Sequence, residues 1–331
     1  MDRDLWIACA LALALATGTT VAQEKAEDKA LLVVPEEEGE AGIGGKPVPP
    51  EFQEAVRAYQ DGDYAGAMNR WSALADKDYA PAQFNLGVMY ETGRDAGINY
   101  QRAAEFYEKA SEQDIPNAYL NLGLLYARGA GVEKDDEMAA ELFEAAAELD
   151  LPEAQFNIGI AYLTGRGVDK DEAEAANWFL AAAEAGYRAA QYNMAGLYHR
   201  GVGVDRDIAE ATRWYETAAD SGDPIARYNL GMLMLDARSD RSAAEEAARH
   251  IELAANQGVT AAQNQIAIMY ARGVGVKPDQ ETALTWFEIA AGMGDDQAIG
   301  NRDRFAATLS PDTRAMAEQR ARAFRPQNTL P

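Results

Sequence analysis

Apolar residues along most of the chain recur with a period of 36 residues. Within one period, Ala154, Ile158 and Tyr162 fall four residues apart, which places them on one face of a helix. Gly159 lies inside this pattern, where a glycine costs about 1 kcal/mol of helix propensity relative to alanine. We therefore expect it to allow close approach of a paired helix. The pattern starts six times in phase, at Ala82, Ala118, Ala154, Ala190, Ala226 and Ala262, and a seventh start at Ala298 runs into the C-terminal end.

A glycine-rich turn and a second helical pattern complete each period. Gly165 and Gly167 supply the positive φ that a helix C-terminus and a tight turn require. Asp171 suits the N-cap of the second helix, and Glu174 three residues later completes a capping-box pattern. That helix has an apolar face at spacings i, i+3, i+4 and i+7, formed by Ala175, Trp178, Phe179 and Ala182. A further glycine ends it in four copies, at Gly186, Gly222, Gly258 and Gly294.

A helix pair of this kind cannot bury both faces alone, so neighbouring pairs must stack. The segments A-x-x-N-L-G-x-x-Y, G-x-G-V-x-x-D and A-x-x-W-F-x-x-A-A resemble the Sel1-like repeats, which are relatives of the tetratricopeptide repeats. The resemblance covers six repeats over residues 82–297. It implies an all-α fold, a right-handed α-solenoid of helix-turn-helix repeats.

Two copies depart from the pattern. The first has Asp95 and Ala96 where the second glycine and the valine belong. The fifth departs most, because its tyrosine, both turn glycines and its tryptophan are replaced by Met234, Ala237, Ser239 and His250. We expect both helices of the fifth copy and make no prediction for the turn between them.

The ends of the array are expected to differ from the repeats, since one face of an end unit meets water. Residues 51–81 predict an atypical helix pair, residues 298–325 predict capping helices, and residues 326–331 form a tail. Ser310 and Pro311 suit the cap and first turn of the last helix. This helix is rich in arginine, which either suits the helix dipole or offers a surface to an acidic partner. Both interpretations stay open at this point.

The first 22 residues predict a secretory signal peptide. Leu5–Ala16 is an apolar run of signal-peptide length, and small residues up to Ala22 offer a cleavage site. An uncleaved anchor is the alternative. Cleavage would remove Cys9, the only cysteine, and with it all thiol chemistry. Residues 23–50 are acidic and contain proline and glycine, so we expect a flexible linker.

Charge and motifs argue against several classes of function. The formal net charge is −24 without a basic stripe, which disfavours nucleic acid and anionic lipid as partners. The two histidines, His199 and His250, belong to different repeats, and the sequence contains no H-E-x-x-H or G-x-S-x-G motif. Paired acids such as Asp169 and Asp171 are explained better by capping than by calcium. We therefore predict no enzyme, no metal, no cofactor and no membrane insertion after signal cleavage.

One polar position persists on the otherwise apolar first helices. It is occupied by Asn85, Asn121, Asn157, Asn193, Asn229 and, in the last copy, Gln265. In tetratricopeptide relatives the first helices line a concave groove, and an Asn in the matching place binds a peptide backbone. The resemblance thus implies a protein or peptide partner, and an amide offers both the donor and the acceptor that a peptide backbone demands. Alternatively, the same side chain bridges adjacent repeats by bonding to a buried backbone group.

Further candidates lie on the same side of these helices. Seven residues after the amide, alternate copies carry an arginine, at Arg128, Arg200 and Arg272. Aromatic residues adjoin the amide, among them Tyr192 and Tyr228. They serve either as walls of a groove or as packing between repeats.

These features predict an exported scaffold, periplasmic or secreted; they leave its oligomeric state open and favour a monomer. The resemblance to exported bacterial members of the Sel1-like family implies an adaptor or regulator in the cell envelope that binds a partner on the concave face. One alternative is a scaffold that faces carbohydrate, which aromatic side chains exposed in the groove would favour. The other is a hydrolase of cell-wall or β-lactam substrates, because some Sel1-like proteins have been linked to β-lactam binding or hydrolysis. Those relatives are rich in cysteine and this chain is not.

Overall fold

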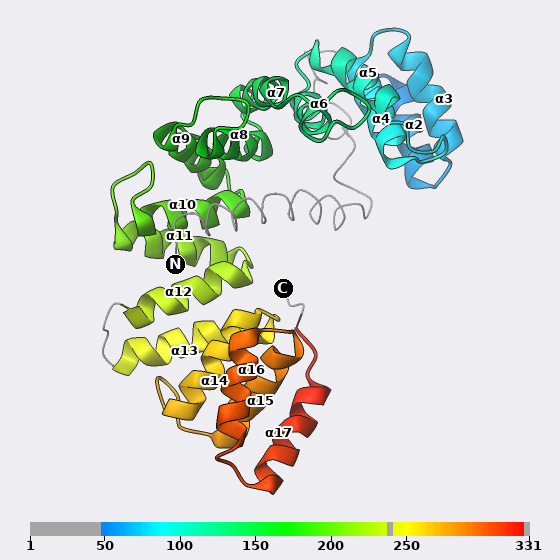
Figure 1. Ribbon diagram of the computed structural model, residues 1–331. Coiled ribbons are helices and arrows are strands. Elements are labelled where there is room, and N and C mark those ends of the chain that lie inside the picture. The colour runs from blue at the N-terminus through cyan, green and yellow to red at the C-terminus, as the bar shows by residue number, and fades with distance from the viewer. Residues whose placement is uncertain (1–47, 237–240, 328–331) are drawn as a thin grey trace. The chain divides into compact units, whose positions relative to one another are not determined.

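The computed structural model describes residues 48–236 and 241–327, and over these ranges the chain forms sixteen α-helices and no strand (Figure 1). The all-α repeat fold predicted from the 36-residue period is therefore confirmed. The chain divides into two compact units. Of the described residues, the N-terminal unit comprises 48–190 and 202–204, and the C-terminal unit comprises 191–201, 205–236 and 241–327.

The N-terminal unit consists of helix pairs in which each helix packs on the next one in sequence. An atypical pair precedes three repeats, and Phe52 and Trp71 form the buried centre of that first pair. The helices are α2 (Pro50–Gln60), α3 (Tyr64–Ala75), α4 (Ala80–Thr92), α5 (Tyr100–Ser111), α6 (Pro116–Arg128), α7 (Asp136–Glu148), α8 (Pro152–Thr164) and α9 (Glu172–Glu184).

The C-terminal unit also consists of first and second helices in turn, and it ends in two further helices. Its helices are α10 (Arg188–Arg200), which begins at the border of the two units, α11 (Ile208–Asp220), α12 (Pro224–Asp236), α13 (Arg241–Asn256), α14 (Thr260–Arg272), α15 (Gln280–Gly292), α16 (Asp296–Ala306) and α17 (Pro311–Ala323). The two helices expected for the fifth copy are thus present as α12 and α13. The turn between them, at residues 237–240, lies outside the described residues.

Four of the six repeats have a glycine in the middle of the first helix, and this glycine allows the second helix of the same repeat to approach closely, as expected. A Cβ atom built on Gly159 would lie 2.9 Å from the ring of Phe179, and one on Gly87 would lie 2.6 Å from the ring of Tyr107. Both distances are shorter than carbon atoms tolerate. The aromatic side chain of the second helix therefore occupies the space that a larger residue would need.

The two turn glycines have different reasons to be glycine. Gly165 ends α8 with φ +71° and satisfies the αL position of the helix C-terminus. Gly167 also has a positive φ, and a Cβ atom there would overlap the carbonyl oxygen of Asp136, at the start of the second helix of the preceding repeat. Gly203 and Gly275 stand in the same relation to Glu172 and Ala244. The second glycine is thus required by the stacking of repeats.

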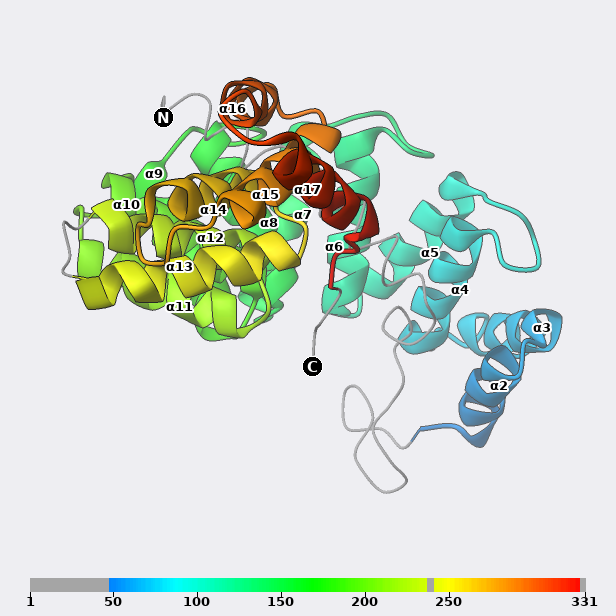
Figure 2. The same ribbon diagram turned by 90° about the horizontal axis from the view of Figure 1, so that it is seen from below.

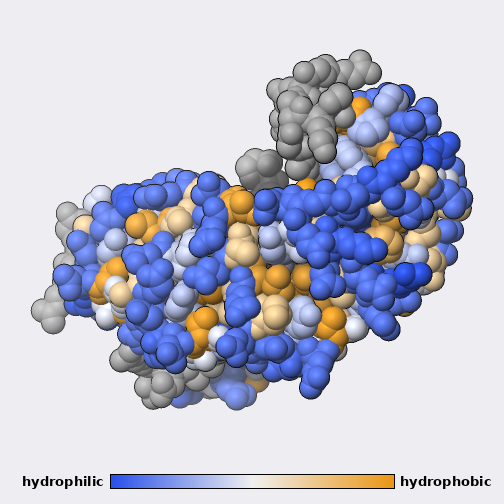
Figure 3. All heavy atoms as spheres, turned by 90° about the horizontal axis from the view of Figure 1, so that it is seen from above, coloured by the Kyte–Doolittle hydropathy of each residue, from blue (hydrophilic) through white to orange (hydrophobic). Residues whose placement is uncertain are grey.

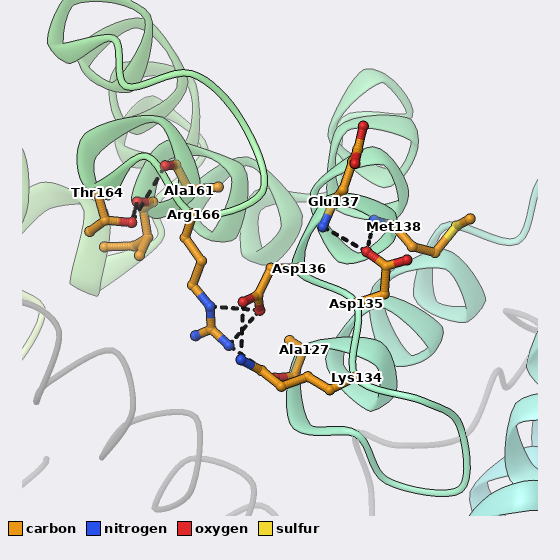
Figure 4. Close-up of polar contacts among 10 residues, drawn as sticks. Ala127, Lys134, Asp135, Asp136, Glu137, Met138, Ala161, Thr164 and Arg166 are labelled. Atoms are coloured by element: carbon orange, nitrogen blue, oxygen red, sulfur yellow. Dashed lines mark hydrogen bonds and ion pairs between the residues drawn. The ribbon is translucent and has the colours of Figure 1, made fainter.

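Arg166, Asp136 and Ala127 form a polar contact between successive repeats of the N-terminal unit, beside Gly167, which we call the polar clasp (Figure 4). Arg166 donates from Nε to Asp136 Oδ1 at 2.7 Å and from Nη2 to the carbonyl oxygen of Ala127 at 2.9 Å. The hydrogen bond from Arg166 holds the pKa of Asp136 below its usual value, and Lys134 adds to the effect. The clasp ties the turn after α8 to both helices of the preceding repeat.

The predicted caps are present. Asp171 accepts hydrogen bonds from the backbone N–H groups of Ala173 and Glu174 at the start of α9. Ser310 caps α17 in the same way, accepting from the N–H of Thr313. The second helices end at a residue with positive φ, which is Gly186, Gly222, Gly258 or Gly294 in later copies and Asp78, Asp114 or Asp150 in earlier ones.

The last helix packs on the second helix of the sixth repeat, as Figure 1 and Figure 2 both show for α17 and α15. Leu309 and Ala317 bury their side chains against Leu284. Arg320 reaches Glu281 on α15 at 3.0 Å, so at least one arginine of this helix pairs within the chain.

Several sequence predictions concern residues outside the described ranges. These are the signal peptide, most of the linker and the last four residues of the tail. Within the described residues, no helix combines the length and the apolar character needed to cross a membrane.

Candidate binding surface

The amide position forms a register along the first helices of both units. Each of the six predicted amides is the sixth residue of its helix, from Asn85 in α4 to Gln265 in α14. Asn301 holds the same place in α16 and is not among the predicted residues, although it follows Gln265 by one period. Asn85 and Asn193 are almost fully buried, with 0% and 2% exposure. The remaining members are half-buried, at Asn121, Asn157, Asn229, Gln265 and Asn301.

Several of these amides bridge neighbouring repeats through side chains. Asn229 donates from Nδ2 to the hydroxyl of Tyr192 at 3.2 Å, and Asn301 donates from Nδ2 to Asn264 Oδ1 at 3.0 Å. Both contacts join successive first helices over 37 residues. Asn157 instead donates to the carbonyl oxygen of Glu153 in its own helix, at 2.7 Å. In the C-terminal unit, the two bridging contacts fix the orientation of these amides on the first-helix side.

The arginines end their helices in different environments. Arg128 and Arg272 are exposed. Arg200 is half-buried, and burial lowers its pKa to about 10, while the neighbouring Tyr215 and Tyr192 partly oppose this shift. Two exposed guanidinium groups are thus available to solvent on the first-helix side, whereas Arg200 lies among tyrosines.

The two predicted tyrosines serve packing. Tyr192 meets Tyr215 of the paired helix with ring centroids 5.9 Å apart, at an angle typical of tilted aromatic pairs. Tyr228 packs against the core of the sixth repeat and remains half-buried. Burial and the nearby Asp295 carboxylate raise its pKa. Tyr228 therefore both supports the core and faces the cavity described next.

A cavity of about 510 Å³ lies on the first-helix side of the C-terminal unit, among α12, α14 and α16. Its lining is rich in amides, with Asn264, Gln265, Gln297 and Asn301 beside Tyr228 and Arg304. A Cβ atom on Gly300, which also lines it, would meet nothing within 4 Å. Such a lining offers hydrogen-bond donors and acceptors at close spacing, as a peptide backbone or a sugar requires.

A second polar position on the first helices went unnoticed in the sequence. Four glutamines lie two residues before the amide and are buried, at Gln83, Gln155, Gln191 and Gln263. Gln263 donates from Nε2 to the carbonyl oxygen of Ala255 at 3.1 Å, and Gln155 makes the equivalent bond to Ala147 at 3.4 Å. These bonds fasten each first helix to the end of the preceding second helix. The signal was the recurrence of Gln directly after the alanine that starts four of the copies.

The residues that the structure describes place no group of three or more His, Cys, Asp and Glu side chains in a position to hold a metal ion.

Comparison with known proteins places the repeats in a family. The family model of the Sel1 repeat matches residues 80–115, 116–151, 152–187, 188–223, 224–259 and 260–295. The chain belongs to the Sel1 repeat family. Proteins with Sel1 repeats generally mediate protein–protein interaction, and the family is typically non-catalytic.

Among solved structures, this Sel1 repeat protein is similar to a Sel1 repeat protein from Oxalobacter formigenes. The two are 32% identical with a TM-score of 0.64, over 77% of this chain and 75% of the other. It also resembles c5321, described as a protective antigen present in uropathogenic Escherichia coli strains displaying an SLR fold, with 22% identity, a TM-score of 0.46 and 83% of each chain covered. Immunity protein Pa5087 from Pseudomonas aeruginosa is 21% identical with a TM-score of 0.37, over 56% of this chain and 71% of that one. No functionally curated protein matches the sequence.

Proposed function

We propose that this Sel1 repeat protein is an exported, non-catalytic scaffold that binds an extended segment of a partner protein on its first-helix surface. The observation that carries the proposal is the amide-lined cavity among α12, α14 and α16, where Gln265 and Asn301 of the register meet Asn264 and Gln297. The general role of the family in protein–protein interaction supports it.

The chemistry of the cavity fits a peptide backbone. Each peptide unit has one N–H donor and one carbonyl acceptor, and an amide side chain can answer both. In this protein the bond from Asn301 to Asn264 fixes the orientation of both amides before a partner arrives. Such preorganisation reduces the entropy lost on binding.

Binding is best tested with a variant that fills the cavity without removing a bridging amide. Gly300→Leu adds a side chain where the structure has open space, and leucine also favours the helix more than glycine. The native protein and Gly300→Leu would serve as baits in envelope extracts, and each captured protein would then be purified and its affinity measured directly. The proposal predicts a partner whose affinity falls at least about tenfold in the variant, since burial of its contacts is blocked.

The matched control is Ala315→Leu, which adds a leucine at an exposed helical position of the same unit, on α17, outside both this cavity and the other cavity of the unit. Equal loss of affinity in both variants would contradict a first-helix site. A partner that binds Gly300→Leu as tightly as the native protein would contradict it as well. Both variants must keep the native circular dichroism and melting temperature.

Export is proposed from the sequence of the first 22 residues. An apolar run of twelve residues followed by small residues is typical of a cleaved secretory signal. Expression in a bacterial host followed by fractionation and mass spectrometry would test this. The expected result is a periplasmic or secreted protein that begins at Gln23; an intact N-terminus in the cytoplasmic fraction would contradict it.

A carbohydrate ligand is the second candidate. Tyr228 lines the cavity beside amide groups, and aromatic rings next to polar side chains also suit sugars. Titration of the protein with envelope glycans would test this candidate. Saturable glycan binding that is lost in Gly300→Leu would favour it, provided that Gly300→Leu loses no protein partner. The absence of turnover of a chromogenic β-lactam is expected for either ligand.

A further inference from the structure

A second cavity, of about 560 Å³, lies in the C-terminal unit and involves different elements. It is bounded by the end of α15, by α17, by the segment after α17 and by the turn before α14. Figure 1 and Figure 2 both show α17 lying along α15. Apart from Gln263 of α14, its lining residues come from these second-helix and terminal segments rather than from the first helices, so the site is separate from the surface proposed above.

One side of this cavity is apolar and well anchored. Ile289 of α15 and Met293, which follows the last residue of α15, form one part of it, and Phe324 and Pro326 of the segment after α17 form the other. Phe324 packs edge-on against Trp286 with ring centroids 5.3 Å apart. The next turn of the chain is held by a hydrogen bond from the N–H of Gln327 to the carbonyl oxygen of Asn256, at 2.8 Å. Met293 is 69% exposed, so an apolar ligand would gain from covering it.

The polar groups of the cavity include two carboxylates. Glu288 and Glu318 both line it, from α15 and α17. The Glu288 side chain is only 22% exposed, and its ion pair with Arg302 is long, at 3.8 Å. Glu318 pairs at 3.3 Å with Arg322, a cationic residue that also lines the cavity. Burial raises the pKa of Glu288, and Glu318 adds to this while Arg302 opposes it. The partly buried Glu288 carboxylate thus retains capacity to accept hydrogen bonds.

A third acceptor is the buried amide of Gln263, which also lines the cavity. Its side chain is 1% exposed, its nitrogen donates to Ala255, and its Oε1 has no hydrogen-bond partner among the described residues. A buried acceptor without a partner is destabilising.

Other repeats show what is missing at Gln263. In the first repeat, Gln113 donates to Gln83 Oε1 at 2.9 Å, over 30 residues. In the fourth, Ser221 donates to Gln191 Oε1 at 3.2 Å over the same separation. In the sixth repeat the residue 30 positions after Gln263 is Met293, whose side chain has no hydrogen-bond donor. The residue 30 positions after Gln155 is Ala185, whose side chain has none either. The side-chain oxygens of Gln155 and Gln263 both lack a hydrogen-bond partner among the described residues, and of these two residues Gln263 lines this cavity.

We propose that this second cavity binds an alkylammonium or alkylguanidinium group, with the apolar stem against Ile289, Met293 and Phe324 and the cationic head near Glu288. An N–H of the head or its neighbour would supply the donor that Gln263 lacks. Such a group occurs in lysine and arginine side chains of proteins and in free amines. An apolar wall, a partly buried carboxylate and an unpaired acceptor suit this chemistry, and the guanidinium of the lining, Arg322, is paired with Glu318.

The first test uses three ligands with the same chain and different heads: hexylammonium, hexanol and hexanoate. The protein would carry ¹³C-methyl methionine, so that Met293 reports on the cavity and Met316, exposed on α17 and absent from the lining, reports elsewhere. The proposal predicts a saturable shift of the Met293 signal with hexylammonium, and binding about tenfold weaker or worse with hexanoate. Equal binding of all three heads would overturn it, as would the absence of saturation.

Variants then locate the binding. Gly292→Leu places a side chain where a Cβ atom meets nothing within 4 Å, and it should abolish the shift without unfolding the protein. Glu288→Gln should weaken hexylammonium about tenfold and leave hexanol unchanged. Gly300→Leu fills the first-helix cavity and should have no effect, so the failure of either proposal can be recognised separately. Unchanged binding in Gly292→Leu would overturn the assignment.

A second pair of probes separates the two sources of the cation. Acetyl-Leu-Lys-Leu-amide should bind more tightly than its norleucine counterpart if the cavity accepts a lysine side chain of a protein. Binding of hexylammonium without binding of the peptide would assign the site to free amines. The proposal would be overturned if the protein preferred neither hexylammonium over hexanoate nor the lysine peptide over its norleucine counterpart.

Discussion

The turn within each repeat and the turn between repeats both contain residues with positive φ, yet they differ in what they tolerate. Within the repeat, Gly167, Gly203 and Gly275 each abut a backbone carbonyl of the preceding repeat, whereas the first copy, which follows the atypical helix pair, carries Asp95 at the same position with a positive φ. Between repeats, the same φ region is occupied by aspartate in three copies and by glycine in four. A Cβ atom on Gly186 or Gly294 would meet nothing within 4 Å. Positive φ alone therefore admits aspartate, while positive φ combined with a close neighbour demands glycine.

Aspartate at the turn between repeats also makes contacts that glycine cannot. Asp78 accepts hydrogen bonds from Gln83 at 2.9 Å and from Gln113 at 3.2 Å. Asp114 receives only a long contact from the Tyr119 hydroxyl, at 3.5 Å. The αL strain at Asp78 is thus partly offset by a polar network, and the strain at Asp114 much less so.

The largest effect is expected from Gly167→Ala. The new methyl group would overlap the carbonyl oxygen of Asp136 in a backbone region that alanine disfavours, so we expect a loss on the order of 3 kcal/mol in the free energy of unfolding. Urea denaturation followed by circular dichroism would measure it. The control is Gly186→Ala, which has the positive φ without the neighbour and should lose about 1 kcal/mol. Equal losses would remove the distinction between the two turns.

The polar clasp beside Gly167 should make a smaller, pH-dependent contribution. Asp136→Asn removes the charge that Arg166 and Lys134 contact, and we expect a loss of about 1 kcal/mol at pH 7, because the pair is partly exposed.

The sign of the pH dependence follows from the lowered pKa of Asp136 in the folded state. Its stabilisation is present above the unfolded pKa of about 4 and is lost as pH falls through the lower folded value. Urea denaturation of native protein and Asp136→Asn should therefore show a difference at pH 7 that shrinks at pH 3. A difference that stays constant would exclude the clasp as its source.

A gain is expected from Asp114→Gly. Glycine adopts the observed φ of +57° without strain, and little hydrogen bonding is lost, so the free energy of unfolding should rise by roughly 0.5–1 kcal/mol. The same change at Asp78 should gain less or nothing, because its two hydrogen bonds are lost. Melting temperatures of the two variants would show whether they rank in this order.

The smallest effect tests the buried glutamines. Ala185→Gln supplies the donor that Gln155 lacks, in the register where Gln113 serves Gln83, and should stabilise the protein by roughly 0.5–1 kcal/mol. The gain should vanish when Gln155 is first changed to Leu. A gain that persists in that background would mean that Ala185→Gln does not act through Gln155.

The sequence by itself determined the helices, their order and their caps. A helix is indicated by apolar residues three and four positions apart. A cap such as Asp171 accepts from the N–H groups of Ala173 and Glu174. Both signals are therefore local, and both repeat every 36 residues. The close approach at Gly159 could be predicted for the same reason, since the paired helix is the next one in sequence. The amide register with its cavity-lining member Gln265 was also visible as a repeated pattern, and so was the adjoining aromatic position of Tyr228.

Tertiary structure decided the contacts between repeats. Asn301 finds Asn264 and Asn229 finds Tyr192 over 37 residues, one more than the period, because the partner lies on the neighbouring helix and not at the equivalent position. Gly167 must be glycine because a carbonyl group 31 residues earlier lies beside it. The cavity that Gly292 lines is formed when α17 and the segment after it pack against α15. Such features depend on the distance and angle between helices, which the apolar pattern of a single helix does not encode.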